Sequence, residues 1–517
     1  MIELLKPEVP NFTKFCLSRG AHIVDLLIPT EDPLWPGLCN PSILYDNNEL
    51  KLILRNVNYV MHASYNGDRN WSSWGPLLYT IPDEDGRHLK TRNYLCSVHP
   101  IDGITSHELI DTSKNDWEPQ WEFVGHEDAR LVRWNDTLYM TGVRRDDNTT
   151  GVGRMSLCAI EGNVEVSRVK IDDESFNYCE KNWMPILDMP YHYVRSTNPT
   201  VVVKVDPLTG KCETVVEKKE ANLVDHDLQL RGSSQVLPWK DGKHIALIHT
   251  CTLYFNELQK KYARYHFHFI VWDRNWNVEA ISPLFNFNDF LIEFSNGMAI
   301  VDGKFHIPFA LQDNMSFLMT VDESVIEDFI YRKPAEFKDV EHNTINNFFL
   351  KDKDLEALNE LAHLYLSAHF DAGAYCLFQR AADFCDNIYD RYVATFYMTR
   401  ALANIGHRDR SEYDLWWKCI DINSMYPEAW AALSMYAFYR GDYNAAYSYA
   451  LMAYNHRNNA TFYYSSASYI TNLILTGIYT EHVDKSIKLL EQYKSEFPDF
   501  YNDIQKILQS RKIERIL

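Results

Sequence analysis

The sequence predicts a multidomain protein: an all-β five-bladed β-propeller followed by an all-α domain of tetratricopeptide-like helical repeats. Three observations support this prediction. The chain of 517 residues is too long for one ordinary core. Its first part consists of short apolar-polar alternations separated by turns, and its last part repeats apolar positions at helical spacing. We expect the propeller at residues 1–340 and the helical domain at residues 350–517.

The β region contains many short strands. Alternating segments occur at residues 50–57, 131–140, 200–205, 244–249, 265–272 and 304–309. Turn-forming segments at residues 206–210, 240–243 and 301–304 separate some of them. Roughly three hundred residues of this pattern exceed one sandwich and fit a propeller of about five four-stranded blades.

The C-terminal part changes to a helical period. One repeat-like set consists of Leu361, Tyr365, Ala374, Phe378 and Ala381, and a second of Trp430, Leu433, Gly441, Tyr443, Ala446 and Ala453. A degenerate copy with Phe396, Gly406, Trp416 and Cys419 lies between them. Cys419 and Ala453 are one tetratricopeptide repeat length apart. Residues 483–497 and 499–516 are predicted to be the final helices. The helical domain either completes the fold or binds a protein partner or a second copy of the chain.

Composition excludes several classes of function. Lys and Arg total 51 against 71 Asp and Glu, and the net charge of −20 disfavours nucleic acid binding. The chain shows no apolar run long enough to span a membrane and no signal-like start, so a cytoplasmic protein is expected. The 10 cysteines lack paired spacing, and neither a metal-ligand set nor a cofactor is indicated.

The segment His126-Glu127-Asp128-Ala129-Arg130 is the centre of the predicted site. Two adjacent carboxylates with an arginine two residues later favour general acid-base chemistry, because one acid can stay protonated while the other is ionised. Arg144, Arg145 and Arg154 follow shortly afterwards and suggest that an anion is bound. The alternative is a solvated, salt-bridged surface turn.

Four further polar segments interrupt the β region. They are residues 40–43 with the strand that follows at 52–59, residues 180–185, residues 231–235, and residues 292–299 with Asp313 beyond them. Each alone is compatible with an ordinary turn or an exposed ion pair. Their spacing at intervals of tens of residues suggests that they begin the blades, whose first loops meet at one end of a propeller's central channel.

These residues resemble a known family. The segment from His126 to Arg130 is similar to the Gly-x-Glu-Asp-Pro-Arg signature of glycoside hydrolase family 130, the mannoside phosphorylases and hydrolases built on a five-bladed propeller. The other segments stand in matching order, so the resemblance spans residues 40 to 320. The chain also resembles the mannosyltransferases of glycosyltransferase family 108. Ala129 departs from the signature, where proline is usual.

The resemblance implies a role for each candidate residue. The catalytic pair is Asp128, as general acid acting through a sugar hydroxyl, and Glu127. The implied phosphate-binding residues are Arg144, Arg145, Arg154, Lys181 and His249. The implied substrate-binding residues are Arg55, Asn58, Tyr59, Arg130, Asn182, Trp183, Arg231, Glu293 and Asp313.

The sequence therefore predicts an enzyme that transfers a hexosyl group, mannosyl by resemblance, with inversion, between a glycan acceptor and phosphate or a nucleotide sugar. Its expected partners are a sugar phosphate, a nucleotide sugar or a glycan. One alternative is a glycoside hydrolase acting on mannosides. Another is a non-catalytic propeller that binds a glycan while the repeats bind a protein.

Overall fold

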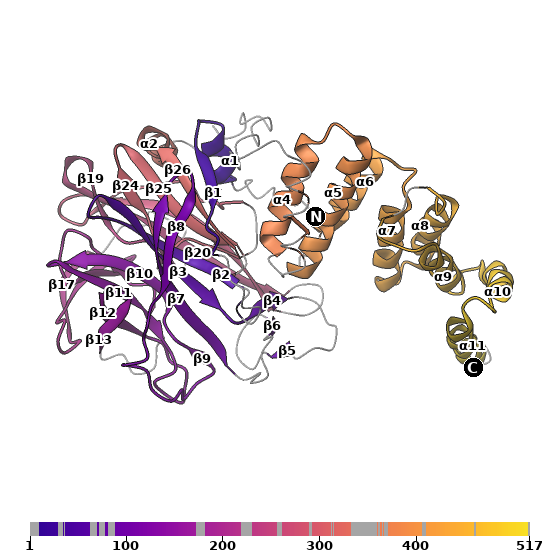
Figure 1. Cartoon of the computed structure of the whole chain (residues 1–517), viewed down its shortest axis with the longest axis horizontal. Coiled ribbons are helices and arrows are strands. Elements are labelled where there is room, and N and C mark those ends of the chain that lie inside the picture. The colour runs from indigo at the N-terminus through magenta and orange to yellow at the C-terminus, as the bar shows by residue number, and fades with distance from the viewer. Residues whose placement is uncertain are drawn as a thin grey trace. The chain divides into compact units, whose positions relative to one another are not determined.

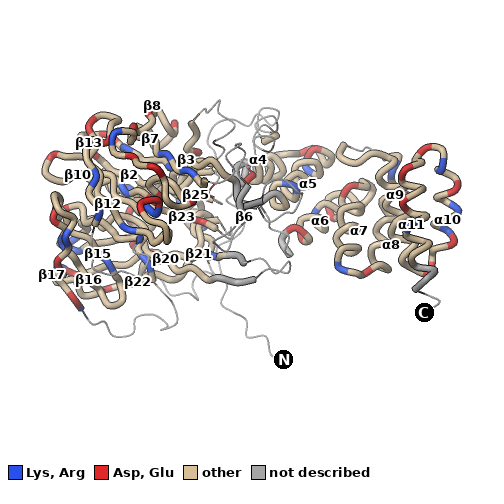
Figure 2. Tube along the Cα trace, turned by 90° about the horizontal axis from the view of Figure 1, so that it is seen from below, with Lys and Arg blue, Asp and Glu red and all other residues tan. Residues whose placement is uncertain are grey.

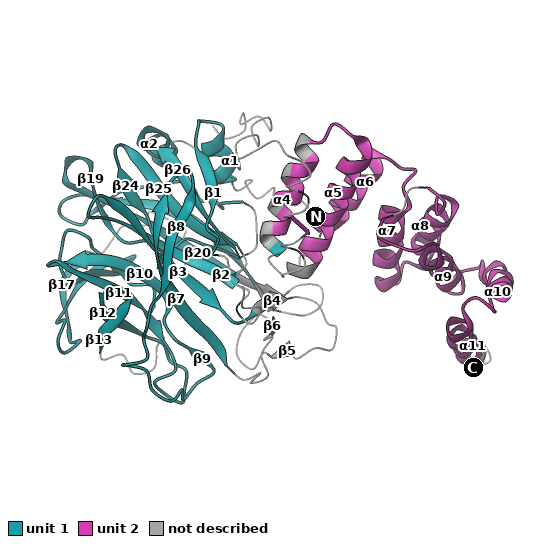
Figure 3. Cartoon of the chain, in the orientation of Figure 1, with its two compact units in different colours: residues 1–352, 367–373 teal, residues 353–366, 374–517 magenta. Residues whose placement is uncertain are grey.

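The computed structural model describes most of the chain. The described residues are 10–28, 35, 37–62, 70–71, 78–80, 88–171, 181–218, 230–255, 261–288, 292–311, 313, 315–331, 359, 362–363, 366, 371–405, 410–459 and 462–514. The chain divides into two compact units, one built mainly of strands and one of helices (Figure 3). The predicted boundary at residues 340–350 lies outside the described residues, as do Leu361, Tyr365 and Gly406.

Most strands of the first unit belong to five mainly antiparallel sheets, the blades of the propeller (Figure 1). Blade 1 contains β2 (Gly37–Asp46), β3 (Glu49–Val57), β7 (Leu89–His99) and β8 (Gly103–Leu109), with β9 (Phe123–Val124) beside β7. Blade 2 contains β10 (Glu127–Trp134), β11 (Thr137–Arg144), β12 (Arg154–Glu161) and β13 (Val164–Lys170). Blade 3 contains β14 (Met184–Pro185), β15 (His192–Thr197), β16 (Thr200–Val205) and β17 (Cys212–Lys218).

The last two blades complete the ring. Blade 4 contains β18 (Arg231–Gly232), β20 (Lys243–Phe255), β21 (Lys261–Trp272) and β22 (Val278–Ile281), with β19 (Leu237–Trp239) on β20. Blade 5 contains β23 (Glu293–Phe294), β25 (Lys304–Leu311), β26 (Met315–Asp322) and β1 (His22–Asp25), with β24 (Ala299–Val301) on β25. Because β1 comes from the N-terminal region and pairs with β26, the last blade is closed by the beginning of the chain. The predicted five-bladed propeller is confirmed.

Smaller elements accompany the blades. Helix α1 (Phe12–Leu17) buries Phe12 against Phe285 and against Phe329 of helix α2 (Glu323–Tyr331), with ring centroids 4.4 Å and 4.8 Å apart. A separate three-stranded sheet consists of β4 (Val60–His62), β6 (Leu78–Thr80) and β5 (Asn70–Trp71).

One predicted strand is in fact a hairpin. The alternation at residues 131–140 continues through Asn135 and Asp136, but both residues have left-handed backbone angles, with φ of 48° and 64°. Asn and Asp tolerate this conformation better than most residues, and two such positions in succession make the tight turn that a two-residue hairpin requires. The segment therefore reverses direction and supplies parts of both β10 and β11.

The second unit consists of consecutive helices. They are α4 (Asp371–Phe384), α5 (Ile388–Ile405), α6 (Arg410–Ile422), α7 (Pro427–Tyr439), α8 (Tyr443–Asn455), α9 (Ser466–Gly477), α10 (Val483–Gln492) and α11 (Pro498–Glu514). From α5 to α10 each helix packs on the next. Ala446 and Ala453 are fully buried, which allows this close approach, and Trp430 packs against Trp417 and Tyr449. The predicted helical repeat architecture is confirmed.

Charged residues of both signs are interspersed along the strands and the helices (Figure 2). Among the residues that the structure describes, no helix combines the length and the apolar character needed to cross a lipid bilayer.

Candidate functional site

Asp128 lies on a distorted strand at the start of blade 2. The pairing of β10 with β11 shifts register between Glu127 and Arg130, and Asp128 adopts a φ of 52°. Blade 1 has the same distortion: β2 shifts register between Cys39 and Ser42, and Asn40 adopts a φ of 47°. A bulge of this kind turns one side chain away from the regular alternation of the strand. The two redirected side chains meet, because Asn40 Nδ2 donates a hydrogen bond to Asp128 Oδ1 at 2.7 Å.

A chain of hydrogen bonds connects Asp128 to a second acid. Arg55 donates to Asp128 Oδ1 at 3.1 Å and to the hydroxyl of Tyr59 at 3.3 Å. Tyr59 in turn donates to Asp313 Oδ2 at 3.0 Å. Thr91 accepts two further bonds from the Arg55 guanidinium and so fixes its plane. We call Asn40, Arg55, Tyr59, Asp128 and Asp313 the acid cluster.

The two acids of this cluster have opposite pKa shifts. Burial alone raises the pKa of Asp128, but the charges of Arg55, Lys181 and Arg130 and the bond from Asn40 outweigh it, so its pKa lies below the usual value. Burial raises the pKa of Asp313 above the usual value, and the nearby charge of Asp128 adds to the effect. Separated pKa values are the arrangement by which a pair of carboxyl groups divides acid and base roles.

A polar network ties the first strands of the blades together beside this cluster. The Gln235 amide donates to the carbonyls of Ile43 and Leu131 and to the Ser42 hydroxyl, while its oxygen accepts the backbone N–H of Met298. Gln235 therefore joins residues of blades 1, 2 and 5 from its own position at the start of blade 4. Its side chain is fully buried.

Arg130 belongs to the same network. Its guanidinium donates to the carbonyls of Ser233, at 2.7 Å, and Asp128, at 2.9 Å, and it is completely buried. Burial lowers its pKa to about 10, although Asp128 opposes the shift. Asn296 donates to the neighbouring carbonyl of Ala129. The donors of Arg130 therefore hold the backbone of the acid in place, and its sugar-binding role stays a prediction.

Replacing Gln235 by leucine should lower the free energy of unfolding of the propeller by about 3 kcal/mol, because two buried carbonyls and a buried N–H lose their partners. Urea denaturation followed by near-ultraviolet circular dichroism would show this as a lower midpoint. Gln120 is exposed, so Gln120→Leu is the matched control and should leave the midpoint nearly unchanged. Equal midpoints for the two variants would contradict the role given to Gln235.

Three cations lie near the acids. Lys181, half-buried just before β14, contributes its charge at both Asp128 and His249. Arg231, exposed on β18, pairs with His249 in the β18–β20 ladder. The guanidinium of Arg145 lies 3.4 Å from Glu127 Oε1. The structure therefore brings Lys181, Arg231 and Arg145 into the neighbourhood predicted for an anion.

His249 is present in the same neighbourhood but uncharged. Burial, with Arg231 and Lys181 next in importance, places its pKa well below the usual value. Its Nδ1 lies 2.8 Å from the Ser233 hydroxyl. A neutral imidazole can exchange single hydrogen bonds with a phosphate but does not add positive charge.

Two further predicted phosphate ligands, Arg144 and Arg154, face each other on neighbouring strands of blade 2. The Arg144 guanidinium makes two hydrogen bonds to Asp146 and one to Asp116, and it stacks on Trp117 with its Cζ 4.5 Å from the ring centroid. Arg154 lies opposite Arg144 in the β11–β12 ladder. The donors of Arg144 therefore hold carboxylates, and its role in binding phosphate stays a prediction, as does that of Arg154.

Three predicted substrate contacts have structural roles. Asn58 bridges the backbone of His88 and Lys90. Glu293 accepts the backbone N–H groups of Phe287 and Asn288. Trp183 is buried in the core cluster between blades 2 and 3, with its ring 6.0 Å from that of Tyr193. The expected contacts of Asn58 and Glu293 with sugar hydroxyls and of Trp183 with a sugar ring stay predictions.

Several buried amide oxygens near the acid cluster lack a hydrogen-bond partner among the described residues: those of Asn40, Asn182 and Asn296. Asn182 also has a left-handed φ of 66°, as Asp313 has at 49°. Unpaired buried acceptors and strained backbone are unfavourable in a structural core and are characteristic of ligand-binding sites. The sequence pattern had identified Asn182 and Asp313 as candidate site residues. It gave no sign of Thr91, which holds the Arg55 guanidinium.

No protein-family model and no curated protein matches the chain. Similar solved structures include the β-1,2-mannobiose phosphorylase of Listeria innocua, at 14% identity, with a TM-score of 0.37 over 60% of this chain and 99% of that one. Another is MPT-1, a GDP-Man-dependent mannosyltransferase from Leishmania mexicana, at 13% identity and a TM-score of 0.36 over 58% and 89% of the two chains. TPR-like repeats of a Podosopora anserina kinesin light chain are similar at 15% identity and a TM-score of 0.23, over 28% and 74%.

Proposed function

We propose that the propeller is a carbohydrate-active enzyme that transfers a hexosyl group between a phosphate-bearing carrier and a glycan hydroxyl, with inversion. The sequence resemblance points to mannose as the hexose. The observation that supports the reaction is the placement of Asp128, a carboxylate with a lowered pKa, in a bulge where Arg55 and Asn40 fix it and Lys181 supplies a nearby positive charge.

The ionised state of Asp128 favours transfer to the acceptor. In this direction Asp128 takes the proton of the acceptor hydroxyl, directly or through a sugar hydroxyl, as a general base. The acceptor oxygen forms a bond to the anomeric carbon, and the bond from that carbon to the phosphate oxygen breaks, so the electron pair leaves with the phosphate group. Phosphorolysis is the reverse reaction and requires Asp128 to be protonated first, which its lowered pKa disfavours.

The proposal divides the remaining residues between the two ends of the donor. Lys181 and Arg231 are assigned to the phosphate, because both are at least partly accessible and both act on the same buried histidine. Arg145 and Glu127, which face each other, border this position. The amide oxygens of Asn40 and Asn182 and the carboxyl group of Asp313 are assigned to sugar hydroxyls.

The direct test incubates the full chain with a panel of hexose 1-phosphates and nucleotide sugars, together with oligosaccharide acceptors. Release of phosphate or nucleotide that depends on the acceptor, with an inverted anomeric product by nuclear magnetic resonance, is the expected result. Release of free hexose from a glycoside without phosphate would instead identify a hydrolase. Glycan binding without turnover on any donor would identify a binding module.

Replacing Arg55 by methionine should move the acidic limb of the pH profile of kcat/KM for transfer to higher pH. Arg55 is the leading charge that lowers the pKa of Asp128, so without it burial dominates and the pKa rises. A general base must be ionised to take a proton. Because the pKa of Asp128 is higher in the variant, the variant loses activity at a higher pH than the wild type does. Arg133→Met is the control and should leave the limb in place: Arg133 lies on β10, the strand of Asp128, but its guanidinium pairs with Asp46. An unchanged limb in the Arg55 variant would show that Asp128 is not the titrating base.

A further inference from the structure

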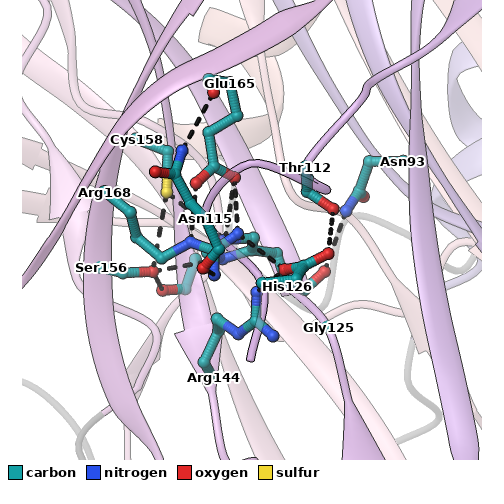
Figure 4. Close-up of polar contacts among 12 residues, drawn as sticks. Asn93, Thr112, Asn115, Gly125, His126, Arg144, Ser156, Cys158, Glu165 and Arg168 are labelled. Atoms are coloured by element: carbon teal, nitrogen blue, oxygen red, sulfur yellow. Dashed lines mark hydrogen bonds and ion pairs between the residues drawn. The ribbon is translucent and has the colours of Figure 1, made fainter. Parts of the chain in front are cut away.

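A second buried cluster lies inside blade 2, apart from the acid cluster. His126 stands immediately before β10, Cys158 lies on β12 and Glu165 on β13. All three are buried, with exposed fractions of 2%, 0% and 0%. Their side chains point toward one another (Figure 4). None of the three takes part in the reaction proposed above.

The spacing of the three donor atoms fits a metal ion. His126 Nε2 lies 3.4 Å from Cys158 Sγ and 3.5 Å from Glu165 Oε2, and all three ligand atoms lie within 4.8 Å of one another. Zinc binds sulfur at about 2.3 Å and nitrogen or oxygen at about 2.0–2.2 Å, so a tetrahedral ion separates such donors by about 3.4–3.6 Å. The two separations from the histidine agree with this value.

We propose that His126, Cys158 and Glu165 bind a divalent transition-metal ion of the zinc class. A thiolate, an imidazole and one carboxylate are the donors that such ions prefer, whereas magnesium and calcium take oxygen ligands. Cys158 and Glu165 are held on paired strands of one blade, and His126 directly precedes another strand of that blade, which fixes their positions closely. A water molecule would supply the fourth ligand.

The surroundings provide the outer contacts that metal ligands usually have. The Ser156 hydroxyl lies 3.2 Å from His126 Nδ1, which leaves Nε2 toward the other two ligands. Arg168 Nε lies 2.7 Å from Glu165 Oε1, while Oε2 is the oxygen that faces His126. Arg168 also approaches Oε2 at 3.0 Å, so an ion here would share that oxygen with a guanidinium. Asn93 donates to the His126 carbonyl at 3.1 Å and fixes the backbone.

The charges of the cluster leave room for a cation. Among the described residues, Glu165, Asp116 and Asp146 are paired with two guanidiniums, those of Arg144 and Arg168, so one negative charge remains in this group. A neutral imidazole, the form that binds a metal ion, does not balance this charge. Binding of a divalent ion with release of the Cys158 proton adds two positive charges and one negative, and brings the total to zero.

Such an ion would be structural. The ligands are buried on every side described, and His126 directly precedes Glu127 and Asp128. A bound metal would therefore fix the backbone at the point where the chain begins the bulge that carries Asp128. The inference does not depend on the proposed transfer reaction, and its test uses no substrate.

The experiment loads the full chain with zinc or cobalt during expression and measures metal content and absorption after dialysis. One zinc ion per chain is expected, and the cobalt form should show a near-ultraviolet thiolate-to-cobalt charge-transfer band. Cys158→Ser should lose the band and the metal. Cys96→Ser is the matched control, because Cys96 is equally buried in an apolar cluster of blade 1, and it should keep both.

Three results would overturn the proposal: a folded wild-type chain without stoichiometric metal, a cobalt form without the charge-transfer band, or a band that persists in Cys158→Ser. The first two use only the wild-type protein, so they decide the matter even if the serine variant fails to fold. Removal of the ion by a chelator should also lower the melting temperature of wild type and Cys96→Ser.

Discussion

Replacing Asp128 by asparagine should lower kcat for hexosyl transfer about a thousandfold, the size of effect typical of a lost general base. The amide has nearly the same shape as the carboxylate, so it can still accept the hydrogen bonds from Asn40 and Arg55 through its oxygen. It cannot take a proton from an acceptor hydroxyl. Binding of a neutral glycan, measured by calorimetry, should therefore change little while turnover is lost.

The control for this variant is Asp46→Asn. Asp46 is also a buried carboxylate of an innermost strand. Burial by itself raises its pKa, but the interactions with Arg133 and Lys51 outweigh burial, so the pKa lies below the usual value. It lies at the far end of β2 from Asn40. Asp46→Asn should reduce stability without reducing kcat per folded molecule. If both variants reduce kcat equally, the loss in Asp128→Asn reflects general damage to the propeller and not the loss of a base.

Much of this arrangement was predictable from local sequence. The polar segments around residues 42, 128, 184, 232 and 293 lie at the first strands of the five blades, because a propeller repeats one unit and places the same end of each unit at the axis. The strand at residues 52–59 and Asp313 lie later in their blades. Asp128, Arg55, Tyr59 and Asp313 were among the residues expected at the site, and the structure joins them in one hydrogen-bonded chain.

Other parts of the site depend on contacts between distant segments. Arg144 was expected to bind phosphate because it follows the acidic pair, but Asp116, on the segment between blades 1 and 2, takes its donors. Likewise, the proposed metal ligands come from two strands and from the residue just before a third, without the close spacing by which metal motifs are recognised. The charge of a side chain does not show which oppositely charged group it will pair with. Such residues can therefore be assigned only once the fold is known.

Replacing Lys181 by methionine should lower kcat/KM for phosphate-bearing donors about a hundredfold. This factor corresponds to the roughly 2–3 kcal/mol that a charge-assisted hydrogen bond contributes to binding. Affinity for a neutral glycan should stay close to that of the wild type. Lys170→Met is the matched control: Lys170 is an exposed lysine whose ion pair with Asp147 lies at the surface, so kcat/KM should be unchanged. Initial rates at several donor concentrations measure the effect.

The Lys181 variant has two possible causes of lost activity, and pH separates them. Lys181 also helps to lower the pKa of Asp128, so its removal raises that pKa and reduces the ionised fraction of the base at low pH. That loss disappears as the pH rises above the new pKa, whereas a missing contact to the phosphate reduces kcat/KM at every pH. We therefore expect a deficit that persists on the plateau of the pH profile. A deficit confined to acidic pH would show that Lys181 acts only on Asp128 and that the phosphate is bound elsewhere.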